Sequence, residues 1–219
     1  MSEVALFKLA HLLCLIYWLG GDLGVFYSSL FVTDEKRSPE VRIATAKILL
    51  TLDLAPRICM TMILPTGVQL GYNIGMLKIP GLLVAAVWVV CLAWLSMVLV
   101  LAFRHGAKLK VLTRVDFHFR WIAPTLFVAY AIHSLLSPTR ILPGYIAYKL
   151  IIFSCLVLCG LMIRLKLRQF TPAFNNMVQG RHTASDSRAI HDALVSTRPF
   201  VLAIWLGILV NVALSINLF

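Results

Sequence analysis

Six ionisable side chains lie within long apolar stretches of the sequence: His11, Asp22, Asp53, Arg57, His133 and Lys149. An ionisable group inside a bilayer is unfavourable unless it is paired or solvated, so each of these residues is a candidate for chemistry or transport. Asp53 and Arg57 are four residues apart, which is the spacing of an intrahelical ion pair. We expect this pair and Asp22, at similar depth, to form a network that either holds the structure together or relays protons.

Three residues of the first apolar stretch share one helix face. At about 100° per residue, Trp18 and Asp22 return to within about 20° of His11. This stripe is predicted to face protein, with Asp22 about 16 Å of helical rise from His11. Glycines beside the stripe would let another backbone or a flat ligand approach closely: Gly20, Gly21 and Gly24.

Two imidazoles are predicted at similar depth on different helices. A six-coordinate haem b takes two such nitrogens from facing helices. We therefore interpret His11 and His133 as axial ligands of haem b, with Trp18 and Gly21 shaping the pocket. The propionates would need cations, for which the sequence offers Lys149, Arg140 and Arg120. An intramembrane histidine is also explained as a hydrogen-bonded packing residue, and that interpretation stays open.

Soft donors in the same region give a second interpretation. His11, Met60, Met62 and the cysteines suit Cu(I), and the buried ionisable residues would then line the path of a copper or small-solute transporter. The five cysteines lie in apolar stretches with no CxxC motif, so neither a disulfide framework nor covalent haem attachment is expected. A third interpretation is a structural partner in a larger membrane complex.

The amino-acid composition indicates that the elements carrying these residues are membrane-spanning helices. Of 219 residues, 60% are hydrophobic and 13% charged, which is too little polar surface for a soluble domain. We predict an all-α bundle of six transmembrane helices in one integral membrane domain over residues 1–219, the first helix being a permanent span. The spans are expected at 4–31, 45–71, 81–103, 117–136, 143–163 and 199–219, the third of them exposed to lipid.

Basic residues predict the orientation of the bundle. Thirteen Lys and Arg lie in the first, third and fifth connections, against Lys78 and Arg140 in the second and fourth. Because cytoplasmic loops collect basic residues, both termini are expected outside the cytoplasm, in a bacterial inner membrane. The long connection 164–198 is predicted to carry a surface helix over 186–194.

The net charge of +11 does not indicate a nucleic-acid partner, because the charge lies in short segments between apolar runs. Membrane lipid is the expected partner.

Parts of the sequence resemble a known family. The run Phe7-Lys8-Leu9-Ala10-His11, followed by Tyr17-Trp18-Leu19-Gly20-Gly21, is similar to the first helix of HemJ-type protoporphyrinogen IX oxidases and of the related CopD copper-resistance domains. The segment Ala147-Tyr148-Lys149-Leu150 is similar to the HemJ helix that carries a lysine. The resemblance covers spans one, two, five and six.

The resemblance implies that His11 binds haem b, that Lys149 is needed for activity, and that electrons pass from a porphyrinogen-like substrate towards quinone or a respiratory chain. CopD relatives imply copper transport instead. HemJ-like chains have four spans, whereas this chain adds the pair 81–136, and Ser29 stands where the family carries arginine. We predict a haem b redox protein, an oxidoreductase, with copper or small-solute transport as the alternative. The substrate, the electron acceptor and any homo-oligomer stay open.

Overall fold

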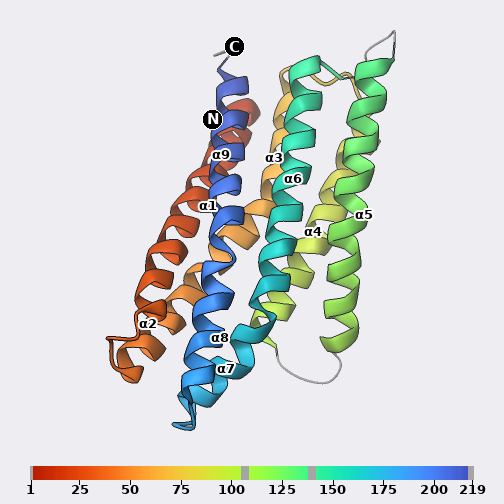
Figure 1. The fold of residues 1–219 in the computed structure, drawn as a ribbon. Helices are drawn as coiled ribbons and strands as arrows, with labels where there is room; N and C mark the ends of the chain where they lie inside the picture. The colour runs from red at the N-terminus through yellow and green to blue at the C-terminus, as the bar shows by residue number, and fades with distance from the viewer. Residues whose placement is uncertain (1, 105–108, 138–141, 217–219) are drawn as a thin grey trace.

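The computed structural model describes residues 2–104, 109–137 and 142–216, and these ranges fold into α-helices joined by short connections (Figure 1). The long helices run side by side along the bundle, and shorter ones extend it at one end. The elements are α1 (Glu3–Thr33), α2 (Pro39–Leu52), α3 (Leu54–Asn73), α4 (Gly81–Phe103), α5 (Leu109–Leu136), α6 (Gly144–Lys166), the 3-10 turn η1 (Leu167–Gln169), α7 (Phe170–Val178), α8 (Ala184–Val195) and α9 (Arg198–Ser215).

Six helical segments are long and apolar enough to cross a membrane, which agrees with the predicted number. The segments are Glu3–Thr33, Pro39–Asn73, Gly81–Phe103, Leu109–Leu136, Gly144–Val178 and Ala184–Ser215. The helix that carries the predicted fourth span, 117–136, begins earlier than the span, because α5 starts at Leu109. The chain is a multi-pass membrane protein. The start of α1 and the end of α9 lie at the same end of the bundle (Figure 1).

The second span is broken into α2 and α3 at Asp53. A proline ring clashes with the carbonyl group four residues earlier and has no N–H to bond to it. For Pro56 that carbonyl belongs to Leu52, the last residue of α2. Pro65, in contrast, lies within α3 without ending it. The break therefore follows from Pro56 and places Asp53 at the start of α3.

Helix α1 packs closely on the junction of α2 and α3. A Cβ atom built on Gly21 would lie 2.6 Å from Cδ of Pro56, and one on Gly24 would lie 3.0 Å from the Leu52 side chain. A Cβ on Gly20 would meet nothing within 4 Å. The predicted close approach of another helix is confirmed at Gly21 and Gly24, whereas no other helix approaches Gly20 as closely. Because the Pro56 ring fills the space beside Gly21, this glycine serves helix packing.

The basic end of the bundle, as we call the end formed by α7, α8 and the start of α2, has its own apolar cluster. Ile190 and Leu194 of α8 pack there with Met177 of α7 and Ala46 of α2. The predicted surface helix over 186–194 corresponds to α8, which begins with a capping box between Thr183 and Asp186. The amphipathic segments after α6 thus form a small helical layer below the spans (Figure 1).

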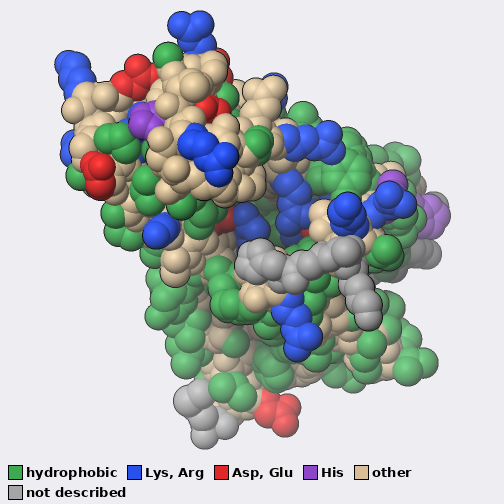
Figure 2. Space-filling model, turned by 90° about the horizontal axis from the view of Figure 1, so that it is seen from below, with side chains coloured by type: hydrophobic (Ala, Val, Ile, Leu, Met, Phe, Trp, Pro, Cys, Tyr) green, Lys and Arg blue, Asp and Glu red, His purple; other side chains and the backbone are tan. Residues whose placement is uncertain are grey.

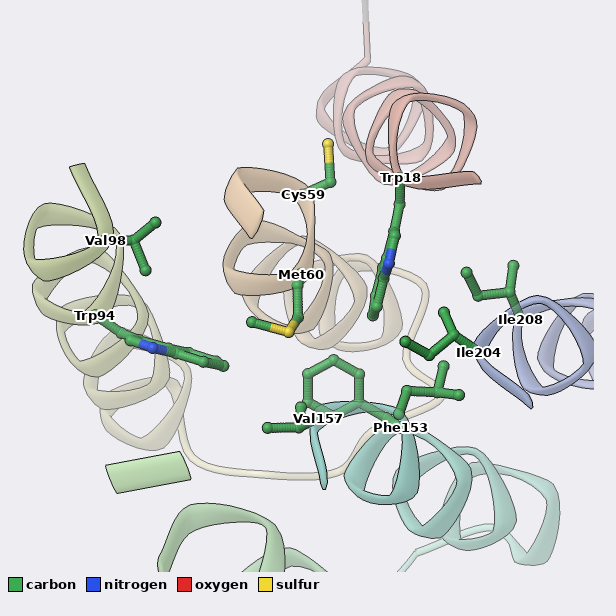
Figure 3. Packing of buried hydrophobic residues seen from close by; sticks show 10 residues of the cluster. Trp18, Cys59, Met60, Trp94, Val98, Phe153, Val157, Ile204 and Ile208 are labelled. Carbon is green, nitrogen blue, oxygen red and sulfur yellow. The ribbon is translucent and has the colours of Figure 1, made fainter. Parts of the chain in front are cut away.

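The main core gathers apolar side chains from several of the spans (Figure 3). Trp18, Met60 and Trp94 point towards it from α1, α3 and α4, and α6 and α9 complete it with Phe153 and Ile204. The Trp18 and Phe153 rings meet edge to face, with centroids 6.5 Å apart. This core separates the two halves of the bundle in which ionisable residues were predicted.

Candidate functional site

A cavity of about 360 Å³ extends from the basic end towards the core, a size within the usual range of ligand pockets. Trp18, Met60, Leu156 and Ile204 form its apolar deep wall, and Arg168 lies among the lining residues from η1. Helices α1, α3, α5, α6 and α9 therefore all contribute side chains to one space.

Arginines outnumber carboxylates around this cavity. The lining includes five arginines, Arg57, Arg120, Arg164, Arg168 and Arg198, and two aspartates, Asp22 and Asp53. Figure 2, which looks at the basic end, shows several basic side chains recessed towards the middle of the molecule. Guanidinium groups stay protonated and bind oxyanions through paired N–H donors, so the lining suits a negatively charged group.

A fully buried carboxylate, Asp116 of α5, holds two of these arginines in place. Its oxygens accept hydrogen bonds from Nε of Arg120 at 3.1 and 3.0 Å and from Nη1 of Arg164. Nε1 of Trp94 donates a further bond to Oδ1 at 3.2 Å. Asp116 is 0% exposed and the Arg120 side chain 5%. One carboxylate thus ties α4, α5 and α6 together beside the cavity.

Two guanidinium nitrogens around the cavity lack an acceptor among the described residues. Nη2 of Arg120 and Nε of Arg198 are buried without a hydrogen-bond partner. Nη1 of Arg120 has only the Met60 sulfur, at 4.0 Å, which is a weak acceptor. Buried donors are normally satisfied, so this pair of unsatisfied donors indicates where a ligand oxygen would be favourable.

The network predicted around Asp53 is confirmed in part. Arg57 donates to Asp53 as the i,i+4 spacing predicted, and Asp22 lines the same cavity. No ion pair joins Asp22 to an arginine within the described part of the chain. Whether any of the three relays protons stays a prediction.

In the other half of the bundle, His11 packs against α3. Its Nδ1 lies 3.1 Å from Oγ1 of Thr66, and its ring covers Gly67, where a Cβ would lie 2.9 Å from Cε1. The Thr66 hydroxyl donates to the carbonyl of Met62 at 2.8 Å, so Nδ1 of His11 is the donor towards Thr66. This assignment leaves the lone pair on Nε2. The predicted protein-facing stripe is confirmed, since Trp18 is buried and His11 and Asp22 are partly buried.

The structure does not bring His133 to His11. His133 is exposed on α5, which packs mainly against α4 and α6, whereas α1 packs against α2, α3, α8 and α9. Within residues 2–104, 109–137 and 142–216, no group of three or more His, Cys, Asp or Glu side chains could hold a metal ion. Paired histidine ligation of haem b therefore does not fit this arrangement.

Lys149 lies away from the cavity. Its Nζ donates to Oγ of Ser215 in α9 at 2.6 Å and lies 5.7 Å from the centroid of the Tyr145 ring. Fifteen residues of α6 separate it from Arg164, about 22 Å of helical rise. The predicted catalytic set is thus divided between the two ends, and Arg140, a predicted propionate contact, lies outside the described residues.

Sequence reasoning missed Asp116 and the role of Trp94. Asp116 stands one residue before the predicted start of the fourth span, and the third span, which carries Trp94, was expected to be exposed to lipid. A signal was present, because Asp116 and Arg120 repeat the i,i+4 spacing of Asp53 and Arg57. Extending the span by one helical turn would have placed both pairs inside the membrane.

Comparison with protein-family models, with curated proteins and with solved structures finds no match to this chain. The resemblance to the HemJ and CopD families, over spans one, two, five and six, therefore stays a prediction.

Proposed function

We propose that this membrane protein binds a negatively charged amphiphile in the cavity at its basic end. The single observation that carries the proposal is the set of five arginines against two aspartates lining a cavity whose other residues are mostly apolar. A ligand with an apolar body and an anionic group matches both parts of this lining. The excess of basic residues at this end supports its placement at the cytoplasmic leaflet of a bacterial inner membrane.

Calorimetric titration in phosphatidylcholine nanodiscs tests this function. Octanoate and octyl sulfate are expected to bind with one-to-one saturation, whereas octyltrimethylammonium, of equal chain length and opposite charge, is expected not to bind. The double substitution Arg168→Gln/Arg198→Gln removes two cavity charges, and we expect about tenfold weaker binding of both anions, equivalent to about 1.4 kcal/mol.

Arg188→Gln supplies the matched control, because Arg188 is an exposed arginine of α8 outside the cavity lining. The Arg188→Gln variant should bind octanoate with the same affinity as the wild type. Equal binding of the cationic and anionic amphiphiles, or no saturable binding of any anion, would show that the cavity is not an anion site.

A second candidate function is redox chemistry with haem b bound through His11. The hydrogen bond to Thr66 favours it, because a ligating histidine usually has its other ring nitrogen held by a protein acceptor. Haem b would supply one-electron chemistry. The exposed position of His133 limits this proposal to one histidine ligand.

An absorption spectrum of the protein purified after haem-replete expression tests the second candidate. We expect a Soret band that His11→Ala abolishes and His133→Ala leaves in place. Colourless protein would rule the haem proposal out. Metal content of the same preparation addresses the copper alternative, since copper bound without porphyrin would favour transport of copper.

A further inference from the structure

One part of the cavity lining carries two guanidinium groups fixed by one carboxylate. Arg120 of α5 and Arg164 of α6 both donate to Oδ2 of Asp116. Their guanidinium groups are therefore neighbours that share one acceptor oxygen. Asp116 balances one of the two positive charges. The guanidinium group of Arg120 is also held in orientation by a cation–π contact, because its Cζ lies 5.3 Å from the centroid of the Trp94 ring.

The side of Arg120 that Asp116 does not occupy lacks an acceptor. Nη2 is buried without a partner among the described residues, and Nη1 has only the Met60 sulfur. Met60 is itself a cavity residue. An oxygen atom entering the cavity beside Met60 would supply the acceptor that this guanidinium needs.

The charge around the cavity exceeds what its carboxylates balance. Five arginines line it, and the carboxylates available to them in the described structure are Asp22, Asp53 and Asp116. Two positive charges are left over across the whole lining, and one of them belongs to the Arg120 and Arg164 pair, because Asp116 balances the other charge of that pair. In a site with mostly apolar walls, charge is best balanced by the ligand itself, which favours a head group carrying two negative charges.

From this juxtaposition we propose that Arg120 and Arg164 form a subsite for the phosphate monoester head group of an amphiphile. The inference rests on the proposed function and specifies its ligand class. A phosphate monoester concentrates two charges on three oxygens of one atom, so it can reach both guanidinium groups at once. Its apolar chain would lie along Trp18, Leu156 and Ile204.

Octyl phosphate and octyl sulfate test the subsite, because they share chain length and tetrahedral shape but differ by one charge at pH 8. We expect the wild type in phosphatidylcholine nanodiscs to bind octyl phosphate about tenfold more tightly than octyl sulfate. In Arg120→Gln this preference should fall below about twofold, while octyl sulfate still binds.

A second variant, Arg164→Gln, tests the subsite if Arg120→Gln does not fold. Arg164 is 31% exposed, so Arg164→Gln removes a subsite charge from a more tolerant position. It should reduce the preference for octyl phosphate in the same direction. Arg188→Gln on α8 should keep the full preference, because its guanidinium is outside the cavity lining.

The outcomes separate the two proposals. Equal affinity of the wild type for octyl phosphate and octyl sulfate overturns the subsite and leaves the anion-binding function standing. No binding of either anion overturns both. Tighter binding of hexylmalonate, which carries two carboxylates on one carbon, than of octyl phosphate overturns the phosphate assignment.

Discussion

Asp116→Ala is expected to destabilise the protein by about 3–5 kcal/mol, because it removes the carboxylate from a buried ion pair and leaves the Arg120 charge uncompensated. The carboxylate is fully buried and also accepts from Arg164 and Trp94. For a chain of this size, the loss corresponds to a melting temperature lower by roughly 10 °C. Thermal unfolding in maltoside detergent, followed by tryptophan fluorescence, measures it.

Asp53→Ala is the matched control for Asp116→Ala, since it removes the aspartate of the other i,i+4 pair. The side chains of Arg57 and Asp53 are 41% and 26% exposed and line the cavity, so this pair is less buried than that of Asp116 and Arg120, and removing its aspartate is expected to destabilise the protein less. Melting temperatures that fall equally in the two variants would mean that the contacts of Asp116 with α4 and α6 do not stabilise the bundle more than the Asp53–Arg57 pair does.

Gly21→Ala is expected to destabilise the bundle by about 1–3 kcal/mol through overpacking. The added methyl group would lie 2.6 Å from Cδ and 2.8 Å from Cγ of Pro56. A proline ring cannot rotate away, so α1 would have to move from the start of α3. The same unfolding measurement tests this expectation.

Gly20→Ala provides a comparison on the neighbouring position of the same helix. Its methyl group would meet nothing within 4 Å, so the gain in helix propensity, about 0.5–1 kcal/mol, should leave stability equal or higher. The two substitutions are therefore expected to act in opposite directions. A loss of stability in Gly20→Ala as large as in Gly21→Ala would contradict the packing observed around Pro56.

The fold was predictable from the sequence because span length and apolarity are local properties. The six spans and the Asp53–Arg57 pair follow from spacing along single helices. The break at Asp53 required more, since the sequence does not indicate whether a proline such as Pro56 bends a helix or ends it.

The candidate site was less predictable because it depends on how the helices are rotated and on which helices are neighbours. Equal depth of His11 and His133 fixes their height in the membrane, but His133 turns outwards on α5. Asp116 gains its importance only when Arg164 arrives from another helix, about 48 positions later in the chain. Such a contact has no local signature.

The buried Asp116 also bears on how the chain enters the bilayer during synthesis. Its helix, α5, is the least apolar of the six spans, and Arg164 belongs to α6, which leaves the ribosome later. Until α6 arrives, the nascent α5 presents an incompletely paired charge cluster to the insertion machinery. We therefore expect α4, α5 and α6 to enter the lipid as one cooperative unit.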